Sequence, residues 1–141
     1  GGDVTYHGPG QLIAYPVLDL KPDRKDLHVY LRDLERVLIK VARELGVKAE
    51  RRPGATGVWT ESGKLAAIGV RVSSGWITSH GVALNVNSQL RYFDAIVPCG
   101  LEGESVTSLE QELGHGVNLG EVSEILTKHF TNVFEYDIPV V

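Results

Sequence analysis

The sequence predicts an α+β fold in which a mixed, mainly antiparallel sheet packs against helices. Two long segments, at residues 23–45 and 119–130, carry apolar residues at the three- and four-residue steps of an amphipathic helix. Between them, residues 47–86 form short apolar runs interrupted by glycine and serine, which is typical of successive strands. An order of strand, helix, several strands and two helices favours this class. No linker or repeat divides the chain, so residues 1–141 are expected to form a single domain.

The first two elements are predicted to be a strand and then the clearest helix of the chain. Residues 12–20 are apolar and compatible with a strand, which a following proline would end. Asp23 or Asp26 is the expected N-cap of the helix at 23–45, and Gly46 stands where a C′ glycine belongs. The apolar positions that share one face of this helix are Leu27, Tyr30, Leu31, Leu34, Val37, Leu38, Val41 and Leu45. The charged residues expected on its solvated face are Arg32, Glu35, Arg36, Lys40 and Glu44.

The later elements are predicted to be three strands and two helices. The three strands are expected at residues 57–60, 65–72 and 75–87. Hairpin turns are expected at residues 61–63 and 73–75. Thr107 and Glu110 have the spacing of a capping box for a short helix that ends at Leu113. The apolar residues that mark the last helix are Leu119, Val122, Ile125, Leu126 and Phe130.

Composition and charge exclude several classes of protein. The formal net charge is -4, so nucleic acid is not the expected partner. The longest apolar run falls short of the roughly 18 residues of a membrane span. The chain has one cysteine, which rules out an internal disulfide and zinc sites of the CxxC type. A single thiol suits a reducing compartment, and a cytoplasmic location is expected.

The start of the chain is a glycine-rich stretch, Gly1-Gly2-Asp3-Val4-Thr5-Tyr6-His7-Gly8-Pro9-Gly10-Gln11. Glycine lets the backbone approach a ligand closely and adopt positive φ angles. Such a loop before a strand is a candidate substrate cradle. A tight turn that leads into the sheet is the alternative interpretation.

Three further motifs follow the glycine-rich start in order along the chain. The first of these is Gly63-Lys64-Leu65-Ala66-Ala67-Ile68-Gly69-Val70-Arg71. The next is His80-Gly81-Val82-Ala83-Leu84-Asn85-Val86-Asn87. The last is Tyr92-Phe93-Asp94-Ala95-Ile96-Val97-Pro98-Cys99-Gly100, followed by Val106-Thr107-Ser108-Leu109. Together with the glycine-rich start, these motifs resemble those of the octanoyltransferases of lipoate synthesis, the lipoate-protein ligase B family.

The resemblance implies a fold like that of biotin and lipoyl protein ligases, with Cys99 and Lys64 as the catalytic pair. The family's arginine before Gly1 is absent, so the domain is expected to lack its N-terminal part. Carried over by position, the substrate-binding residues are Gly1, Gly2, Asp3, Val4, Thr5, Tyr6, His7, Ala67, Ile68, Gly69, Gly81, Val82 and Ala83. Small residues would leave room for an acyl chain, whereas ordinary strand packing is the alternative for residues 67–69.

The chemistry of a thiol and an ammonium group fits this pairing. Cys99 lies between Pro98 and Gly100, a sequence that favours a turn able to present a thiol. A free thiol with a pKa near 8.5 is only a few per cent thiolate at pH 7, and a nearby cation increases that fraction. Taken alone, Cys99 would more often be a small buried residue and Lys64 a solvated one.

The five histidines raise the alternative of a cysteine–histidine dyad. His7 and His80 fall within the motifs, and His7 is the one expected to form a pocket wall or a polar contact. His28, His115 and His129 lie outside the motifs. No two types of metal ligand occur at a metal-binding spacing, so no metal site is predicted.

The resemblance implies an acyl transfer that needs no ATP and no cofactor. The donor would be octanoyl-acyl carrier protein. The acceptors would be lipoyl domains of 2-oxoacid dehydrogenases and the glycine cleavage H protein, with neither nucleic acid nor membrane as partner. The enzyme is expected to be a monomer. Because acyl carrier proteins are acidic, a basic patch would guide docking, and its candidates are Lys48, Arg51, Arg52 and Arg71.

Two other functions remain open from the sequence. An ATP-dependent lipoate or biotin ligase would share the fold, but it needs no nucleophilic cysteine, and the chain has no GxxxxGK[ST] nucleotide loop. A non-catalytic module that binds acyl carrier protein would never form an acyl-enzyme. A requirement for ATP and magnesium distinguishes the first alternative, and the absence of an acyl-enzyme distinguishes the second.

Overall fold

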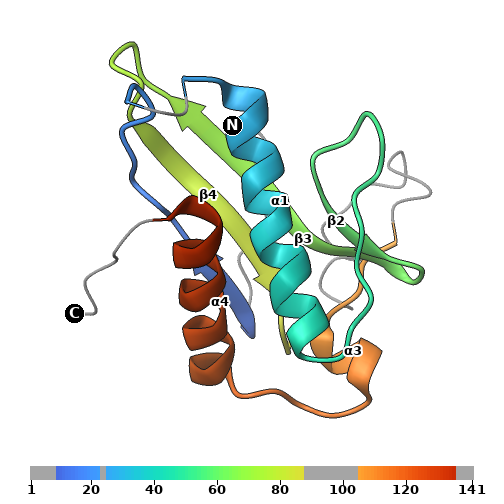
Figure 1. Ribbon diagram of the computed structural model, residues 1–141. Coiled ribbons are helices and arrows are strands. Elements are labelled where there is room, and N and C mark those ends of the chain that lie inside the picture. The colour runs from blue at the N-terminus through green and yellow to red at the C-terminus, as the bar shows by residue number, and fades with distance from the viewer. Residues whose placement is uncertain (1–8, 23–24, 88–104, 136–141) are drawn as a thin grey trace.

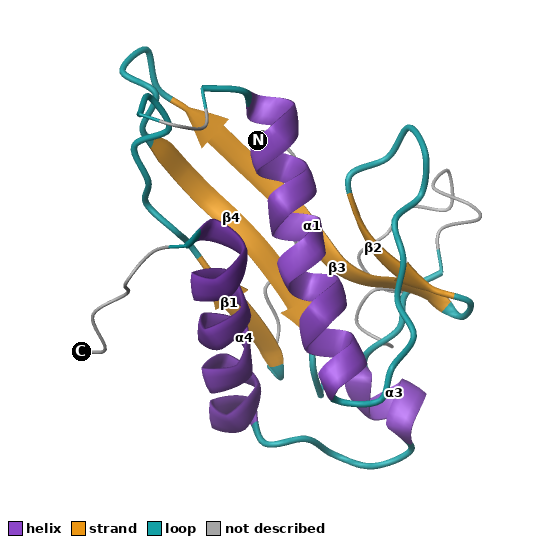
Figure 2. Ribbon diagram, viewed as in Figure 1, coloured by secondary structure: helices purple, strands orange, loops and turns teal. Residues whose placement is uncertain are grey.

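The computed structural model describes residues 9–22, 25–87 and 105–135 and confirms the α+β class. Four strands form one sheet in the order β1-β4-β3-β2, and every neighbouring pair is antiparallel. The strands are β1 (Gln11–Ala14), β2 (Gly57–Thr60), β3 (Gly63–Val72) and β4 (Thr78–Asn85). The helices are α1 (Leu27–Glu44), α3 (Leu109–Leu113) and α4 (Leu119–Phe134). Figures 1 and 2 show α1 and α4 side by side over the same face of the sheet.

Helix α1 confirms most of the predicted pattern. Its N-cap is Asp26, whose side chain accepts a hydrogen bond from the Val29 N–H. Gly46 follows the helix with φ +92°, as expected of a C′ glycine. The helix begins at Leu27, later than predicted, and Leu27 is exposed. The predicted apolar positions that are buried are Tyr30, Leu34, Val37, Leu38 and Val41.

The prediction that all the charged residues of this helix are solvated is wrong for Glu35. Its side chain is 0% exposed. Arg51, which follows the helix in the chain, and Gly57 of β2 both bond to its carboxylate. These partners lie 16 and 22 positions further along the chain, so the helical period alone gives no sign of them.

The predicted strand at residues 12–20 is shorter in the structure, because it ends at Ala14. Pro16 has no N–H to donate, which limits regular pairing beyond this point. The chain then pairs again more loosely with the start of β4, where Leu20 donates its N–H to the Trp76 carbonyl and Thr78 donates to that of Leu18.

The hairpin from β2 to β3 is as predicted, with β2 at residues 57–60 and its turn at Glu61 and Ser62. Strand β3 starts at Gly63, before the predicted Leu65. Strand β4 starts at Thr78, after the predicted Gly75. The delay follows a turn in which Trp76 donates its N–H to the Ser73 carbonyl.

The short helix α3 is capped one residue later than the capping-box spacing predicts. Its N-cap is Ser108, whose side chain accepts from the Gln111 N–H at 3.0 Å. The Thr107 hydroxyl donates instead to a Glu112 carboxylate oxygen at 3.0 Å. Helix α4 begins at Leu119, and the Asn118 side chain caps it by accepting from the Glu121 N–H.

The core lies between the sheet and the two long helices. On the side of the sheet that faces them, Ala66 pairs with Leu84 and Ile68 pairs with Val82. Ala66, Leu84 and Val82 belong to the core, and Ile68 packs against it. None of the helices in the described part of the chain has the length and apolar character that a membrane span requires.

Candidate functional site

The face of the sheet opposite α1 and α4, termed the helix-free face of the described structure, carries small residues in adjoining rows. Ala67 of β3 pairs with Ala83 of β4, which in turn pairs with Ile13 of β1. Gly69 pairs with Gly81 in the next row. Because successive side chains of a strand point to opposite faces, these residues alternate with those in the core. These residues form a mostly apolar surface on this face, termed the floor.

A β-bulge places Lys64 on the same face as this floor. Val58 pairs with Ala66 and Trp59 pairs with Lys64, so Leu65 is an extra residue on β3. Leu65 and Ala66 are both in the core although they are adjacent in sequence. The alternation is therefore interrupted once, and Lys64 lies on the helix-free side together with Ala67.

The Lys64 side chain lies against Trp59 and above Gly57. Its Nζ atom is 5.4 Å from the centroid of the Trp59 ring, within the range of a cation–π interaction. Gly57 has φ +145°, and a Cβ atom added there would lie 3.1 Å from Lys64 Cε and 3.3 Å from Trp59 Cη2. The lysine stem thus occupies space that a side chain at position 57 would fill.

The backbone of Lys64 is bonded to the segment that follows the cysteine motif. The Lys64 N–H donates to the Ser105 carbonyl at 2.8 Å, and the Thr107 N–H donates to the Lys64 carbonyl at 3.0 Å. Gly63 permits this approach, because an added Cβ would lie 2.6 Å from the Ser105 carbonyl carbon. Cys99 precedes Ser105 by only a few positions in the sequence.

Asn85 connects this segment to the rest of the sheet. Its Oδ1 accepts from Gln11 Nε2 at 2.8 Å, and its Nδ2 donates to the Thr107 carbonyl at 3.1 Å. Asn85 is buried, so its amide joins β1, β4 and residue 107 through hydrogen bonds shielded from water. The same connection extends to Lys64, whose carbonyl accepts from Thr107.

The predicted site residues fall into three groups. Cys99 and the range from Gly1 to His7 lie outside the described residues. Those on the helix-free face with Lys64 are Ala67, Gly69, Gly81 and Ala83. Ile68 and Val82 alternate with these and contact the core, so their side chains lie on the other face. The binding roles stay predictions for all of them.

Gly69 and Gly81 occupy different surroundings on the helix-free face. A Cβ added at Gly69 would meet no atom of the described residues within 4 Å. One added at Gly81 would lie 2.1 Å from the Ala14 carbonyl oxygen and 2.9 Å from Pro16 Cδ. Gly81 therefore allows the chain leaving β1 to cross closely, whereas Gly69 has no such neighbour in the described part of the chain.

The histidines of the described residues lie away from Lys64. His28 and His115 are exposed, and His80 is exposed with φ +63° near the Tyr15 ring. His129 contacts Glu44 at 2.8 Å, between α4 and α1. Within the described ranges, no group of three or more histidine, cysteine, aspartate or glutamate side chains could hold a metal ion.

The predicted basic patch is divided by its contacts. Arg51 pairs with the buried Glu35, and Arg52 lies over the Trp59 ring at 5.2 Å. Lys48 and Arg71 are exposed. A charge reversal at Arg51 would therefore damage the fold, and it is unsuitable as a test of docking.

The sequence analysis missed Gly57, Trp59 and Glu35 as neighbours of the site. For the first two, a signal was available in the predicted hairpin. A turn at residues 61–63 brings Trp59 across from the start of the next strand, where Lys64 stands. Glu35 gave no such signal, because its partners depend on the tertiary fold.

Comparison with known proteins identifies the family of this chain. Residues 1–131 match the model of the lipoyl protein ligase A/B catalytic domain. An octanoyltransferase from Christiangramia forsetii is 53% identical over 98% of this chain and 61% of its own length. One from Geobacter metallireducens is 52% identical over 99% of this chain and 65% of its own length. The chain thus spans less than two thirds of these curated relatives.

Solved structures confirm the predicted ligase-like fold. A putative lipoate protein ligase from T. acidophilum with bound lipoic acid has a TM-score of 0.80 and 19% identity, over 99% of this chain and 58% of its own. A biotin protein ligase from Aquifex aeolicus in complex with biotin and ATP has a TM-score of 0.72 and 16% identity, over 89% and 50% of the two chains. At these identities the likeness concerns the fold.

Proposed function

The chain belongs to the family of lipoyl protein ligase A/B catalytic domains, and we propose that the protein is an octanoyltransferase of protein lipoylation. The proposed donor is octanoyl-acyl carrier protein. The proposed acceptor is a specific lysine of lipoyl domains in 2-oxoacid dehydrogenases and the glycine cleavage H protein. This function combines the octanoyltransferase names of the relatives with the position of Lys64.

The observation that supports it best is the attachment of Lys64 to the segment downstream of Cys99. Two backbone hydrogen bonds join Lys64 to Ser105 and Thr107. The lysine also stands on the face that carries the small residues. A cation favours the thiolate of a nearby cysteine, and an apolar surface beside it suits an alkyl chain, so this arrangement supports acyl transfer through a cysteine.

We propose that the reaction proceeds through a thioester on Cys99. The Cys99 thiolate attacks the carbonyl carbon of the donor thioester, its new C–S bond forms, the C–S bond to the carrier breaks, and the carrier leaves as a thiol with a proton from Lys64. The amine of the target lysine then attacks octanoyl-Cys99. The C–N bond forms, the C–S bond breaks, and the thiolate is restored. Lys64 and Cys99 together accept and return the protons of both steps.

A thioester already carries the activation that the amide bond needs, so the proposed reaction requires no ATP. The acyl chain would lie along the floor formed by Ala67, Gly69 and Ala83. Burial of each methylene contributes roughly 0.8 kcal/mol, so an eight-carbon chain gains on the order of 5 kcal/mol. The proposed enzyme works as a monomer in the cytoplasm.

The test is the intact mass of the protein after mixing with octanoyl-acyl carrier protein without ATP. The expected result is a gain of one octanoyl group that hydroxylamine removes. Cys99→Ser should prevent the gain, and Lys64→Ala should slow it strongly. Lys40→Ala, at an exposed lysine of α1 outside the proposed site and the predicted basic patch, is the matched control and should label as fast as the unchanged protein.

A parallel reaction with free octanoate, ATP and magnesium tests the ligase alternative. Acylation of a lipoyl domain only under those conditions would reject the transferase and favour a ligase. Carrier binding without acylation under either condition would favour a binding module.

A further inference from the structure

Trp59 has an unusual environment for a residue of an edge strand. Its side chain is 2% exposed, and its ring lies within 5.4 Å of Lys64 Nζ and 5.2 Å of Arg52 Cζ. Its indole N–H has no hydrogen-bond partner among the described residues. Among the described residues, the indole is therefore held by packing and by contact with the two cations, and not by a hydrogen bond.

Gly57 provides the space in which the Lys64 stem meets the indole. An added Cβ would lie within 3.3 Å of both Lys64 Cε and Trp59 Cη2, and also 2.9 Å from the Ala66 carbonyl oxygen. Only glycine leaves this position open while holding φ at +145°. Gly57 and Trp59 thus form a socket for the lysine, with Gly57 beneath the stem and Trp59 beside the ammonium group.

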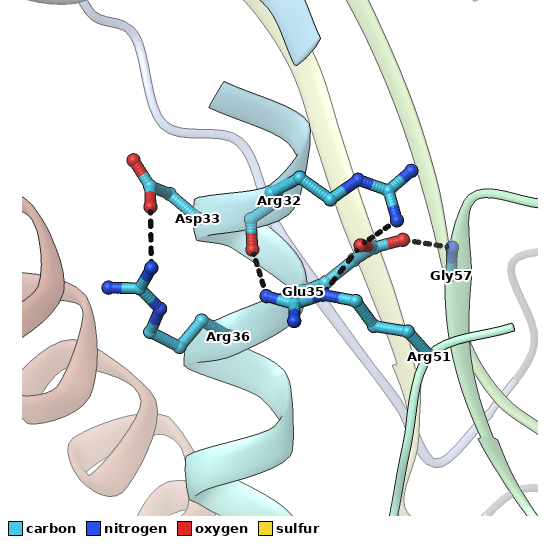
Figure 3. Close-up of polar contacts among 6 residues, drawn as sticks. All are labelled: Arg32, Asp33, Glu35, Arg36, Arg51 and Gly57. Carbon is cyan, nitrogen blue, oxygen red and sulfur yellow. Dashed lines mark hydrogen bonds and ion pairs between the residues drawn. The ribbon is translucent and has the colours of Figure 1, made fainter. Parts of the chain in front are cut away.

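The socket is fastened to helix α1 through the buried carboxylate of Glu35. The Gly57 N–H donates to Glu35 Oε2 at 2.9 Å. Figure 3 shows the carboxylate between the guanidinium groups of Arg32 and Arg51, with one oxygen directed at the Gly57 nitrogen. Since Glu35 is 0% exposed, this anchor is shielded from water. The first residue of β2 is thus bonded directly to the helix.

We propose that Trp59 is a positioning residue for Lys64, and that the aromatic face of Trp59 holds the Lys64 ammonium group in place. The proposal rests on the proposed function, in which Lys64 exchanges protons with Cys99. The negative face of an aromatic ring attracts an ammonium group and limits the directions the flexible lysine stem takes. Without the ring, the ammonium samples more positions, and a misplacement of about 1 Å can slow a reaction on the order of 100-fold.

The test compares Trp59→Phe with Trp59→Leu. Both remove volume from the same buried position, and only phenylalanine keeps an aromatic face. In single-turnover acylation by octanoyl-acyl carrier protein, Trp59→Phe should stay within about 3-fold of the unchanged protein. Trp59→Leu should be slower by about 10- to 100-fold, with the concentration of carrier that gives half-maximal rate unchanged.

Thermal unfolding of both variants accompanies the kinetics. The proposal would be overturned if the loss of acylation rate in each variant were proportional to its loss of unfolding temperature. Equal acylation rates for the two variants would also overturn it. A readout independent of activity is the NMR shift of the Lys64 ε-methylene protons. The nearby ring should displace this shift in Trp59→Phe and not in Trp59→Leu, and identical shifts in both variants would also overturn it.

Lys64→Ala in the same assay separates this proposal from the proposed function. If Lys64→Ala is as fast as the unchanged protein, the role of Lys64 fails, and the role of Trp59 fails with it. If Lys64→Ala is slow while Trp59→Leu matches Trp59→Phe, the catalytic lysine stands and only the socket is rejected.

Discussion

The N–H of Gly57 donates a 2.9 Å hydrogen bond to the carboxylate of Glu35, which joins the first residue of β2 to the middle of helix α1. The other carboxylate oxygen accepts from Arg51 Nε at 3.1 Å and lies 2.8 Å from Arg32 Nη1. The carboxylate therefore pairs with two guanidinium groups and accepts a hydrogen bond from a buried backbone N–H. These contacts couple the edge of the sheet that carries Lys64 to the helical layer.

Replacement of Glu35 by alanine should destabilise the fold by about 3 kcal/mol. The loss leaves the Gly57 N–H without its acceptor and two arginines without their counter-ion, and breaking a buried ion pair on one side is costly. Glu35→Gln should lose less, since its amide oxygen can still accept from Gly57. Urea unfolding measures both, with the exposed Glu124→Ala as control. Equal stability of Glu35→Ala and the control would contradict the role of this carboxylate.

The same carboxylate shows where reading the sequence reached its limit. Helical periodicity located α1 and its buried face because that signal is local. It placed Glu35 in solvent because two of its partners, Arg51 and Gly57, come from elsewhere in the chain. Helical periodicity indicates which side of a helix is polar. It does not indicate whether another segment of the chain covers part of that side.

The bulge at Leu65 illustrates a second limit. The hairpin and its turn were predicted from local signals, and the resemblance of the ordered motifs predicted Lys64 as a catalytic residue. Strict alternation along β3, however, would put Lys64 on the same face as Ala66, toward the core. The extra residue moves Lys64 to the opposite face of the sheet. A strict two-residue alternation does not predict where such a bulge occurs. The position of Lys64 on the helix-free face therefore emerged only with the structure.

Loss of the Asn85 amide should destabilise the protein by about 1–3 kcal/mol. Asn85→Ala leaves the Thr107 carbonyl and the Gln11 amide without this buried partner, and unsatisfied buried polar groups carry a cost of that size. Because Thr107 also bonds to Lys64, Asn85→Ala is expected to slow acylation as well. Urea unfolding is the measurement, and the exposed Asn132→Ala on α4 is the control. Unfolding free energies that agree between the two variants would argue against this network.

The contact between the ends of α1 and α4 should make stability depend on pH. Lys128 and then His129 donate to Glu44 and hold the pKa of that carboxyl below its ordinary value of 4.5. Because the folded pKa is lowered, the stabilisation is present above the unfolded pKa and is lost as pH falls through the folded pKa. Urea unfolding should therefore show a difference between the unchanged protein and Glu44→Gln at pH 6 that shrinks toward pH 3. A difference that grows on acidification would contradict this assignment.

Alanine at Gly81 should destabilise the sheet, because its Cβ would lie 2.1 Å from the Ala14 carbonyl oxygen. That atom belongs to the backbone of β1, so the strand itself must move, and overpacking of this kind costs about 1–3 kcal/mol or more. Thermal unfolding measures the effect. A Gly81→Ala protein as stable as the unchanged one would show that β1 can move aside without loss.

The matched substitution Gly69→Ala tests the acyl floor without disturbing the fold. Gly69 pairs with Gly81 in the same row, yet an added Cβ meets no described atom within 4 Å, so stability should change by less than about 0.5 kcal/mol. If the octanoyl chain lies on this face, the new methyl group occupies part of its path. Acylation by octanoyl-acyl carrier protein should then slow more than acylation by a shorter acyl carrier thioester. Equal slowing with both donors, or none with either, would place the chain away from Gly69, because only direct contact with the end of the chain makes the effect depend on its length.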